Sequence, residues 1–188
     1  MKYEPARFEI FLTKLAFILY AKSVYRAFAD CLPIVGNELV LDFGCGMGTV
    51  AYYTAKRLKD GHLTCLEISG RWLNTCRKTL RGYENVTFLH AEATALPEER
   101  FDVVYCHFVL HDIPEIDLQT VLPALVKALR PGGSLVFREP LRDTEKLSLI
   151  RRLITHSGLH HKESRVIHIP VTGSTLESIY IKNNGGVS

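Results

Sequence analysis

The sequence lacks several features that mark common classes of protein. Its five cysteines include no C-x-x-C pair and follow no secretory signal, which argues against a disulfide framework and favours free, buried thiols in a reducing cytoplasm. The longest apolar run near the N-terminus, Leu15 to Ala21, is far shorter than the ~20 residues that span a bilayer, so no membrane segment is expected. The basic residues are scattered and the net charge is only +3. Composition therefore gives no reason to expect a nucleic-acid partner.

The length allows one well-filled core and leaves too little chain for two ordinary domains, because 188 residues that are 47% hydrophobic suit a single domain. We expect an N-terminal helical segment over residues 1–32 and a main domain over 33–188. Residues 6–29 contain no glycine or proline. Their apolar side chains form two stripes on roughly opposite sides of a helix, one with Phe8, Phe11, Leu12, Leu15, Ile18 and Leu19 and the other with Ile10, Phe17, Val24 and Phe28.

A helix that is apolar on two faces must cover something on each of them. One face is expected to pack on the domain, which leaves the other for a substrate, a lid contact or a second subunit. A homodimer through this helix is therefore one possibility. Plain core packing of a curved or broken helix is the alternative.

Strands and helices alternate along the rest of the chain. The expected strands cover 38–43, 62–68, 86–90, 101–106, 134–137, 165–169 and 175–182. Helices are expected after the first, second and fourth of these strands and over 144–157, with a turn at 130–133. Strands separated by helices imply right-handed crossovers. The sequence predicts a doubly wound α/β fold, with a mostly parallel seven-stranded sheet, helices on both faces and a C-terminal antiparallel hairpin.

A glycine-rich turn follows the first expected strand. Asp42 ends that strand, and glycines follow at 44, 46 and 48 before an apolar, alanine-containing helix. Glycine permits positive φ and close approach of a ligand to the backbone, and a helix N-terminus presents N–H groups to it. Glu67 ends the next strand about 20 residues on, where an acid can accept hydrogen bonds from both ribose hydroxyls. These residues predict a nucleoside-bearing cofactor, and they suit nicotinamide cofactors as well as other adenosine cofactors.

The complete set of motifs narrows the choice of cofactor. In order and spacing it resembles the class I S-adenosylmethionine-dependent methyltransferases, over roughly residues 38–183. The motifs are Asp-x-Gly-x-Gly-x-Gly at 42–48, Glu67, Ala91-Glu92-Ala93, Phe101-Asp102-Val103-Val104 and Leu129-Arg130-Pro131-Gly132-Gly133-Ser134-Leu135. A dinucleotide dehydrogenase prefers G-x-G-x-x-G and lacks the Arg-Pro-Gly-Gly turn. The resemblance implies a Rossmann-like methyltransferase fold with S-adenosylmethionine as the cofactor.

The resemblance also implies which residues bind the cofactor. The glycine loop would lie against the methionine part, with Asp42 near its amino group, and Glu67 would take the ribose diol. Around the adenine, Ile68 would pack on the ring, Glu92 would accept from the amino group and the Ala93 N–H would donate to the ring. The full set is Asp42, Gly44, Cys45, Gly46, Gly48, Glu67, Ile68, Glu92, Ala93 and Cys106.

Two histidines after the fourth strand are candidates for catalysis. A sulfonium already activates its methyl group, so the protein mainly aligns a nucleophile and excludes water. A hydroxyl or protonated amine also needs a base, and His107 and His111 can titrate near neutrality. His111-Asp112 resembles the Leu-His-Asp element of small-molecule O-methyltransferases, where that histidine is the base. A histidine that only packs or caps the next helix is the alternative, and that family's long N-terminal dimerisation domain is missing here.

Other acceptors and metal chemistry find less support in the sequence. No metal site is expected, because the adjacent His160 and His161 would point to opposite faces of a strand. The Asn-Pro-Pro-aromatic motif of enzymes that methylate amino groups of nucleic acids is absent. Thiolate or metalloid methylation would need exposed cysteines, and only Cys31 and Cys106 could border a pocket.

The sequence therefore predicts a cytoplasmic S-adenosylmethionine-dependent methyltransferase that acts on oxygen, nitrogen or carbon of a small molecule. The N-terminal helical segment is the expected lid or interface, and its aromatic residues favour a partly apolar substrate. Neither nucleic acid nor a membrane is an expected partner. Two alternatives stay open, namely an inactive cofactor-binding partner subunit and a nicotinamide-dependent oxidoreductase.

Overall fold

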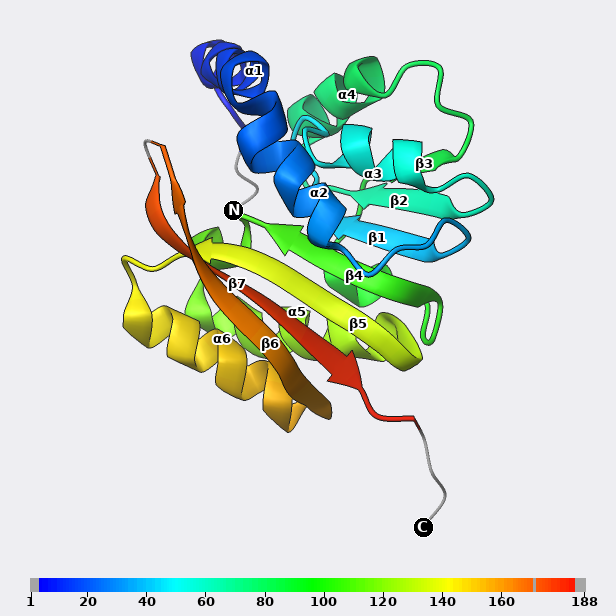
Figure 1. Ribbon diagram of the computed structural model, residues 1–188, viewed down its shortest axis with the longest axis vertical. Coiled ribbons are helices and arrows are strands. Elements are labelled where there is room, and N and C mark those ends of the chain that lie inside the picture. The colour runs from blue at the N-terminus through cyan, green and yellow to red at the C-terminus, as the bar shows by residue number, and fades with distance from the viewer. Residues whose placement is uncertain (1–3, 171, 185–188) are drawn as a thin grey trace. The chain divides into compact units, whose positions relative to one another are not determined.

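The chain forms two compact units, of which the first ends at Glu92 and the second begins at Ala93. The structure is a computed structural model that describes residues 4–170 and 172–184. Figure 1 labels the helices and strands of both units. Within the described residues, no helix combines the length and the apolar character needed to cross a bilayer.

Unit 1 begins with a broken helical segment rather than one regular helix. The segment consists of α1 (Arg7–Tyr20), a π-helical turn η1 (Ala21–Arg26) and α2 (Ala27–Cys31) (Figure 1). The stripe that begins at Phe8 is exposed along the whole of α1, whereas Val24 and Phe28 of the other stripe are buried. The helix therefore packs on unit 1 with one face, as predicted, and the apolar side chains of the other face are open to a further contact.

Aromatic rings hold the packed face of this segment. The ring of Phe17 meets those of Tyr25, Tyr52 and Tyr53 edge to face, with centroid separations of 5.7, 5.9 and 6.2 Å. Such edge-to-face pairs are favourable because the positive edge of one ring meets the negative face of another. In addition, the Arg57 guanidinium donates hydrogen bonds to the carbonyls of Ala29, Leu32 and Ile34, of which the first lies in α2 and the others follow it. The N-terminal helices are thus fixed to the helix that carries Tyr52, Tyr53 and Arg57.

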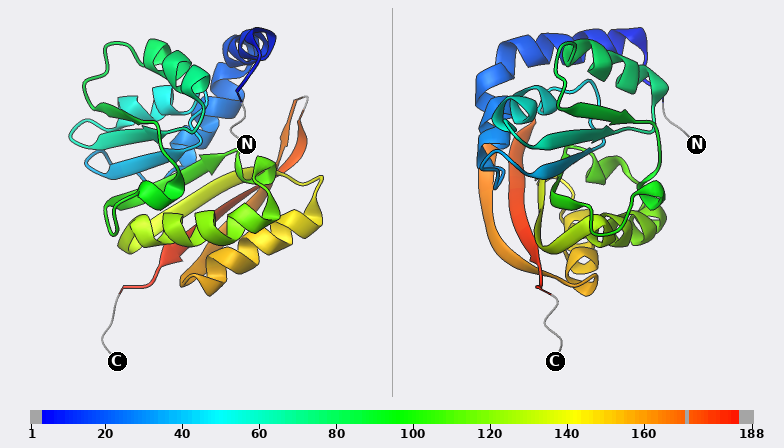
Figure 2. Two further views of the ribbon diagram at one scale, coloured as in Figure 1. Left: turned by 180° about the vertical axis from the view of Figure 1, so that it is seen from behind. Right: turned by 90° about the vertical axis from the view of Figure 1, so that its right-hand side faces the viewer.

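The rest of unit 1 is a parallel three-stranded sheet with its crossover helices on one face (Figure 2). The strands have the order β3-β2-β1. Their bounds are Leu39–Phe43 (β1), His62–Leu66 (β2) and Val86–Leu89 (β3), and the helices are Ala51–Arg57 (α3) and Gly70–Thr79 (α4). Ser69 caps the N-terminus of α4, since its hydroxyl accepts a hydrogen bond from the Trp72 N–H at 3.2 Å.

Unit 2 holds four strands in the order β4-β5-β7-β6, with its two longer helices side by side on one face (Figure 2). Strands β4 and β5 are parallel, and β7 pairs antiparallel with both β5 and β6. The strands are Phe101–His107 (β4), Leu129–Pro140 (β5), Leu159–Ile169 (β6) and Gly173–Lys182 (β7), and the helices are Glu115–Ala128 (α5) and Thr144–His156 (α6). Helix α5 runs through Pro123 without a break.

Two predicted boundaries in unit 2 were wrong. The expected turn at 130–133 belongs to β5, which already pairs with β4 at Leu129 and then shifts register before Ser134. Such a shift takes up extra residues in one strand without ending it, so a glycine-rich stretch can look like a separate turn. The hairpin is also longer than predicted, because β6 begins directly after Gly158. Most side chains of β6 are exposed and polar, so the apolar pattern of the sequence did not indicate the first part of the strand.

A buried charge cluster links three strands of unit 2. The Arg138 side chain is 1% exposed and the Glu177 side chain 3% exposed. Arg138 Nε and Nη2 both donate to Glu177 Oε2, at 2.9 and 2.6 Å. The other carboxylate oxygen accepts from Arg165 Nε at 2.6 Å. Each buried charge therefore has an opposite charge at hydrogen-bond distance, which offsets the loss of water around it.

The fold class is the one that the sequence predicts. Strands β1, β2 and β3 are parallel to one another, β4 and β5 are parallel to each other, and the last two strands form the antiparallel hairpin of a seven-stranded sheet. The strand ends differ from the predictions mainly by one or two residues, except at β5 and β6. The carboxyl ends of β1, β2 and β4, where binding residues are expected in this class of fold, carry the candidate site residues.

Candidate functional site

The glycine loop of unit 1 has the backbone conformation that its sequence predicts. Gly44, Gly46 and Gly48 have φ of 70, 52 and 82°, in the region that side chains with a Cβ rarely adopt. The N–H groups of Gly44 and Cys45 both donate to the Leu66 carbonyl, at 2.9 and 3.1 Å. These two bonds fix the loop to the end of β2.

The glycines differ in what surrounds them. A Cβ added at Gly48 would lie 2.7 Å from the Cys76 sulfur, so this glycine permits close packing inside the unit. A Cβ added at Gly46 would meet no atom within 4 Å. The loop therefore presents the backbone of Gly46 to open space, as a loop that takes a ligand against its main chain requires.

Glu67 lies directly against this loop. Glu67 is only 8% exposed. Its two carboxylate oxygens accept hydrogen bonds from the N–H groups of Gly46 and Ser69, each at 3.0 Å. Burial raises the pKa of Glu67, although these N–H donors favour the charged form. A carboxylate offers about four lone-pair sites. Glu67 can therefore accept further hydrogen bonds, such as those from a diol.

The other predicted cofactor residues of unit 1 have contrasting environments. Asp42 is buried in β1, whereas Glu92 is exposed. Ile68 follows the buried strand β2 and is 40% exposed, which leaves an apolar surface for a flat ring. Glu4, which no sequence motif singles out, accepts hydrogen bonds from the Ser69 hydroxyl at 2.9 Å and the Gly70 N–H at 3.0 Å.

Two of the predicted cofactor residues belong to unit 2. Ala93 is buried in a 3-10 turn, η2 (Ala93–Ala95), and Cys106 is fully buried in β4. A buried thiol presents no acceptor atom to a substrate. Cys106 is therefore not one of the exposed cysteines that thiolate or metalloid methylation would need.

The two candidate histidines frame a strained residue at the end of β4. Phe108 has φ of 56°, which is uncommon for a bulky side chain, and its ring centroid lies 4.5 Å from that of His107 and 6.5 Å from that of His111. Backbone strain of this kind persists only where the surroundings impose it, and it clusters at functional sites. Burial, together with the charge of Arg138, lowers the pKa of His107 well below its ordinary value. His107 is therefore neutral at pH 7.

His111 is held by a buried carboxylate that the sequence did not reveal. Its Nδ1 lies 2.5 Å from Glu139 Oε2. Glu139 is fully buried at the end of β5, and its Oε1 accepts from the N–H groups of Val109 and Leu110 at 3.0 and 2.7 Å. These bonds fix the turn η3 (Leu110–Asp112) and so the orientation of the imidazole. The one sequence signal for Glu139 is its position next to Arg138. Two adjacent charged residues inside an apolar strand are unusual and indicate that their side chains have a specific role.

The groups around His111 favour the protonated imidazole more than water does. Burial lowers its pKa, but the hydrogen bond and charge of Glu139, together with the charge of Asp112, outweigh burial and raise the pKa above 6.5. The other ring nitrogen, Nε2, lies 3.3 Å from Asp112 Oδ1. Because Glu139 occupies Nδ1, Nε2 is the atom that can take or give a proton.

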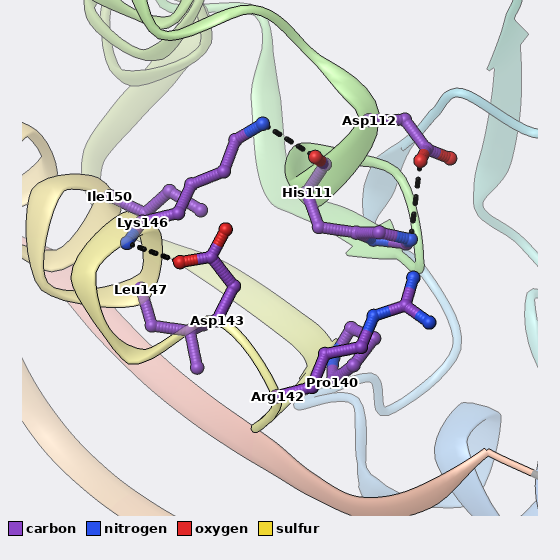
Figure 3. Close-up of a pocket in the computed structure, with 8 residues that line it drawn as sticks. All are labelled: His111, Asp112, Pro140, Arg142, Asp143, Lys146, Leu147 and Ile150. Atoms are coloured by element: carbon purple, nitrogen blue, oxygen red, sulfur yellow. Dashed lines mark hydrogen bonds and ion pairs between the residues drawn. The ribbon is translucent and has the colours of Figure 1, made fainter.

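A small pocket adjoins His111 (Figure 3). Its volume is about 140 Å³. Eight residues line it: His111, Asp112, Pro140, Arg142, Asp143, Lys146, Leu147 and Ile150. Figure 3 shows the side chains of Asp112 and Arg142 on either side of the imidazole. Lys146 Nζ donates to the His111 carbonyl at 2.5 Å. The pocket thus combines a titratable ring with both signs of charge.

A model of the methyltransferase domain matches residues 40–133, which is half of the chain. The chain belongs to the class I S-adenosylmethionine-dependent methyltransferases. It is 33% identical over 136 residues to a demethylmenaquinone methyltransferase of Clavibacter sepedonicus, covering 71% of this chain and 51% of that relative. It is 32% identical over 128 residues to a trans-aconitate 2-methyltransferase of Methylobacterium radiotolerans, covering 68% of this chain and 47% of that relative.

Solved structures of other methyltransferases have the same fold as this chain. Magnesium protoporphyrin IX methyltransferase from Synechocystis, solved with bound S-adenosylmethionine, superposes with a TM-score of 0.71. The match covers 96% of this chain and 86% of that one, at 16% sequence identity. The chain spans about half the length of the curated relatives that it matches.

The cofactor of this methyltransferase is S-adenosylmethionine, and the glycine loop fits such a molecule. The open space beside Gly46, the buried Glu67 carboxylate and the exposed Ile68 side chain offer a backbone surface, a diol acceptor and an apolar platform. Which of the ten predicted residues contact the cofactor stays a prediction.

Proposed function

We propose that the chain transfers a methyl group from S-adenosylmethionine to a small-molecule acceptor, with His111 as the general base. The observation that carries this proposal is the bond between His111 Nδ1 and the buried Glu139 carboxylate, at 2.5 Å. A histidine that only packs or caps a helix does not need a buried carboxylate at hydrogen-bond distance from its ring nitrogen. The two relatives described above are named for small molecules, which supports an acceptor of that class.

In the proposed reaction the cofactor supplies a methyl group that its sulfonium centre already activates. The protein supplies orientation and a place for the proton. With Nδ1–H donating to Glu139, the neutral ring carries its lone pair on Nε2, which removes the proton from the acceptor. The resulting imidazolium is stabilised by Glu139 on one side and by Asp112, whose Oδ1 lies 3.3 Å from Nε2, on the other.

The acceptor atom that suits this arrangement best is an oxygen or a carbon that becomes nucleophilic on losing a proton. A hydroxyl has such a proton, as does an enol. The exposed apolar face of α1 suits a lid over a partly apolar substrate, or an interface with a second copy of the chain. A transfer assay with methyl-labelled S-adenosylmethionine and a panel of phenols, quinols and unsaturated carboxylic acids tests the proposal. Cofactor binding without label transfer to any compound would instead favour an inactive partner subunit.

Glu67→Ala is expected to weaken binding of S-adenosylmethionine by ~1–3 kcal/mol, because charge-assisted hydrogen bonds to the ribose diol are lost. Isothermal titration calorimetry of the wild type and the variant measures this change. Glu84→Ala, which removes an exposed acid of the same unit, is the matched control. Unchanged affinity would remove Glu67 from the cofactor site. Preferential binding of a nicotinamide cofactor by the wild type would overturn the proposed activity.

The turnover rate should rise with pH through an apparent pKa above 6.5, because only neutral His111 can act as the base and its pKa is raised. The effect of rising pH on the free energy of unfolding has the opposite sign. The attraction between protonated His111 and Glu139 contributes fully below 6.5 and is lost as the pH rises through the folded-state pKa. A pH profile of kcat measures the first effect, and Glu139→Gln should move its rising limb to lower pH. A profile that is flat between pH 6 and 8 would contradict the role of His111.

A further inference from the structure

Three cysteines from separate elements of unit 1 meet at one point. Cys45 lies in the glycine loop, Cys65 in β2 and Cys76 in α4. Their sulfur atoms all lie within 4.8 Å of one another. All three are free thiols, and Cys65 and Cys76 are fully buried while Cys45 is 6% exposed. The packing around them is tight, since a Cβ added at Gly48 would come within 2.7 Å of the Cys76 sulfur.

The separations between these sulfurs are those of donors around a single metal ion. Sulfur atoms bind such ions at ~2.3 Å, so three of them in a plane around one ion lie ~4.0 Å apart. Shifts of a few tenths of an ångström per sulfur therefore close the cluster on an ion. Within the described residues, the group has no fourth histidine, cysteine or carboxylate ligand, and its burial leaves no solvent-facing position for a water.

We propose that Cys45, Cys65 and Cys76 form a binding site for one soft, monovalent metal ion, with Cu⁺ as the biological example. Thiolate ligands select soft ions such as Cu⁺, whereas structural Zn²⁺ sites are almost always four-coordinate. Each sulfur that binds as a thiolate releases its proton to solvent, and the positive charge of the ion offsets part of the negative charge that results. No electron is transferred, and the ion remains Cu⁺ throughout.

The bound ion would join three elements of unit 1 at one point. One ligand belongs to the loop that carries Gly44, Gly46 and Gly48, so the ion would add to the hydrogen bonds that already fix that loop to β2 and would tie it to α4. Because Cys45 is also a predicted cofactor residue, metal binding is measured without S-adenosylmethionine.

An anaerobic titration of the reduced, full-length protein with Cu⁺, in competition with the chelator bathocuproine disulfonate, tests the site. One equivalent of Cu⁺ should be retained against the chelator. Single variants Cys45→Ala, Cys65→Ala and Cys76→Ala should each lower the apparent affinity by at least tenfold. Cys31→Ala and Cys106→Ala are the matched controls, since they remove the two cysteines outside the cluster, and both should retain the full affinity.

X-ray absorption spectroscopy of the wild-type copper complex tests the site without any variant, so the test holds even where a variant fails to fold. Three sulfur neighbours around copper are expected. Fewer than three sulfurs, tighter retention of Zn²⁺ than of Cu⁺, or undiminished Cu⁺ binding by folded Cys76→Ala would each overturn the proposal. Recovery of a disulfide between two of these cysteines in place of bound copper would do the same.

Discussion

His111→Ala is expected to lower kcat by ~10²–10⁴-fold, the usual contribution of a positioned general base. Binding of S-adenosylmethionine should not change, because the predicted cofactor contacts lie elsewhere. The turn η3 keeps its shape in this variant, since the Val109 and Leu110 N–H groups still donate to Glu139. Steady-state kinetics with an acceptor from the transfer assay, combined with calorimetry of cofactor binding, measures both quantities.

His156→Ala removes an exposed histidine from α6 and serves as the control for the effect of any such replacement. Its kcat should remain within about twofold of the wild type. Glu139→Gln keeps a hydrogen-bond acceptor for the imidazole but removes the charge, so an intermediate loss of kcat is expected. A near-normal kcat for His111→Ala would leave that residue only a structural role, namely packing or capping the next helix.

Glu177→Ala should lower the free energy of unfolding by about 3–5 kcal/mol, because removal of one partner leaves a buried charge without compensation. The charge left behind is that of Arg138, which is 1% exposed and bonded to Glu177 through two nitrogens. Urea unfolding followed by circular dichroism measures the change. The loss should be larger than that of any other single removal of an acid in the hairpin.

Glu163→Ala gives the matched control, since it removes an exposed acid from β6 and should change stability by less than about 0.5 kcal/mol. A double replacement, Arg138→Met with Glu177→Leu, should recover most of the loss, because apolar residues of similar volume often replace a buried ion pair at little cost. Equal stability of Glu177→Ala and the wild type would show that the charge cluster is not needed for the fold.

Local patterns predicted those features whose residues are close together in the sequence. The alternation of apolar runs and turns gave the order of strands and helices, and the positive φ of Gly44, Gly46 and Gly48 follows from their spacing after a strand. The cap that Ser69 forms on α4 is local in the same way, since a cap acts on N–H groups two or three residues away. Such features depend on only a few neighbouring residues.

Features that depend on distant parts of the chain were not predicted. Glu139 approaches His111 only because parallel pairing of β4 and β5 aligns His107 with Arg138. The cysteine cluster joins positions from a loop, a strand and a helix, and no spacing rule relates 45, 65 and 76. The early start of β5 at Leu129 also depends on a partner strand. A register between strands is a property of the pair, and neither segment alone specifies it.

The composition of β6 has a consequence for how copies of this chain meet. Among the described strands β6 is the outermost of its order, so its backbone groups on one side have no strand beside them there. Most of its side chains are exposed, and they include Lys162, Glu163 and Arg165. Charged side chains on a terminal strand discourage growth of the sheet by annealing to another molecule. Fibril-like assembly through this side is therefore disfavoured even at high protein concentration.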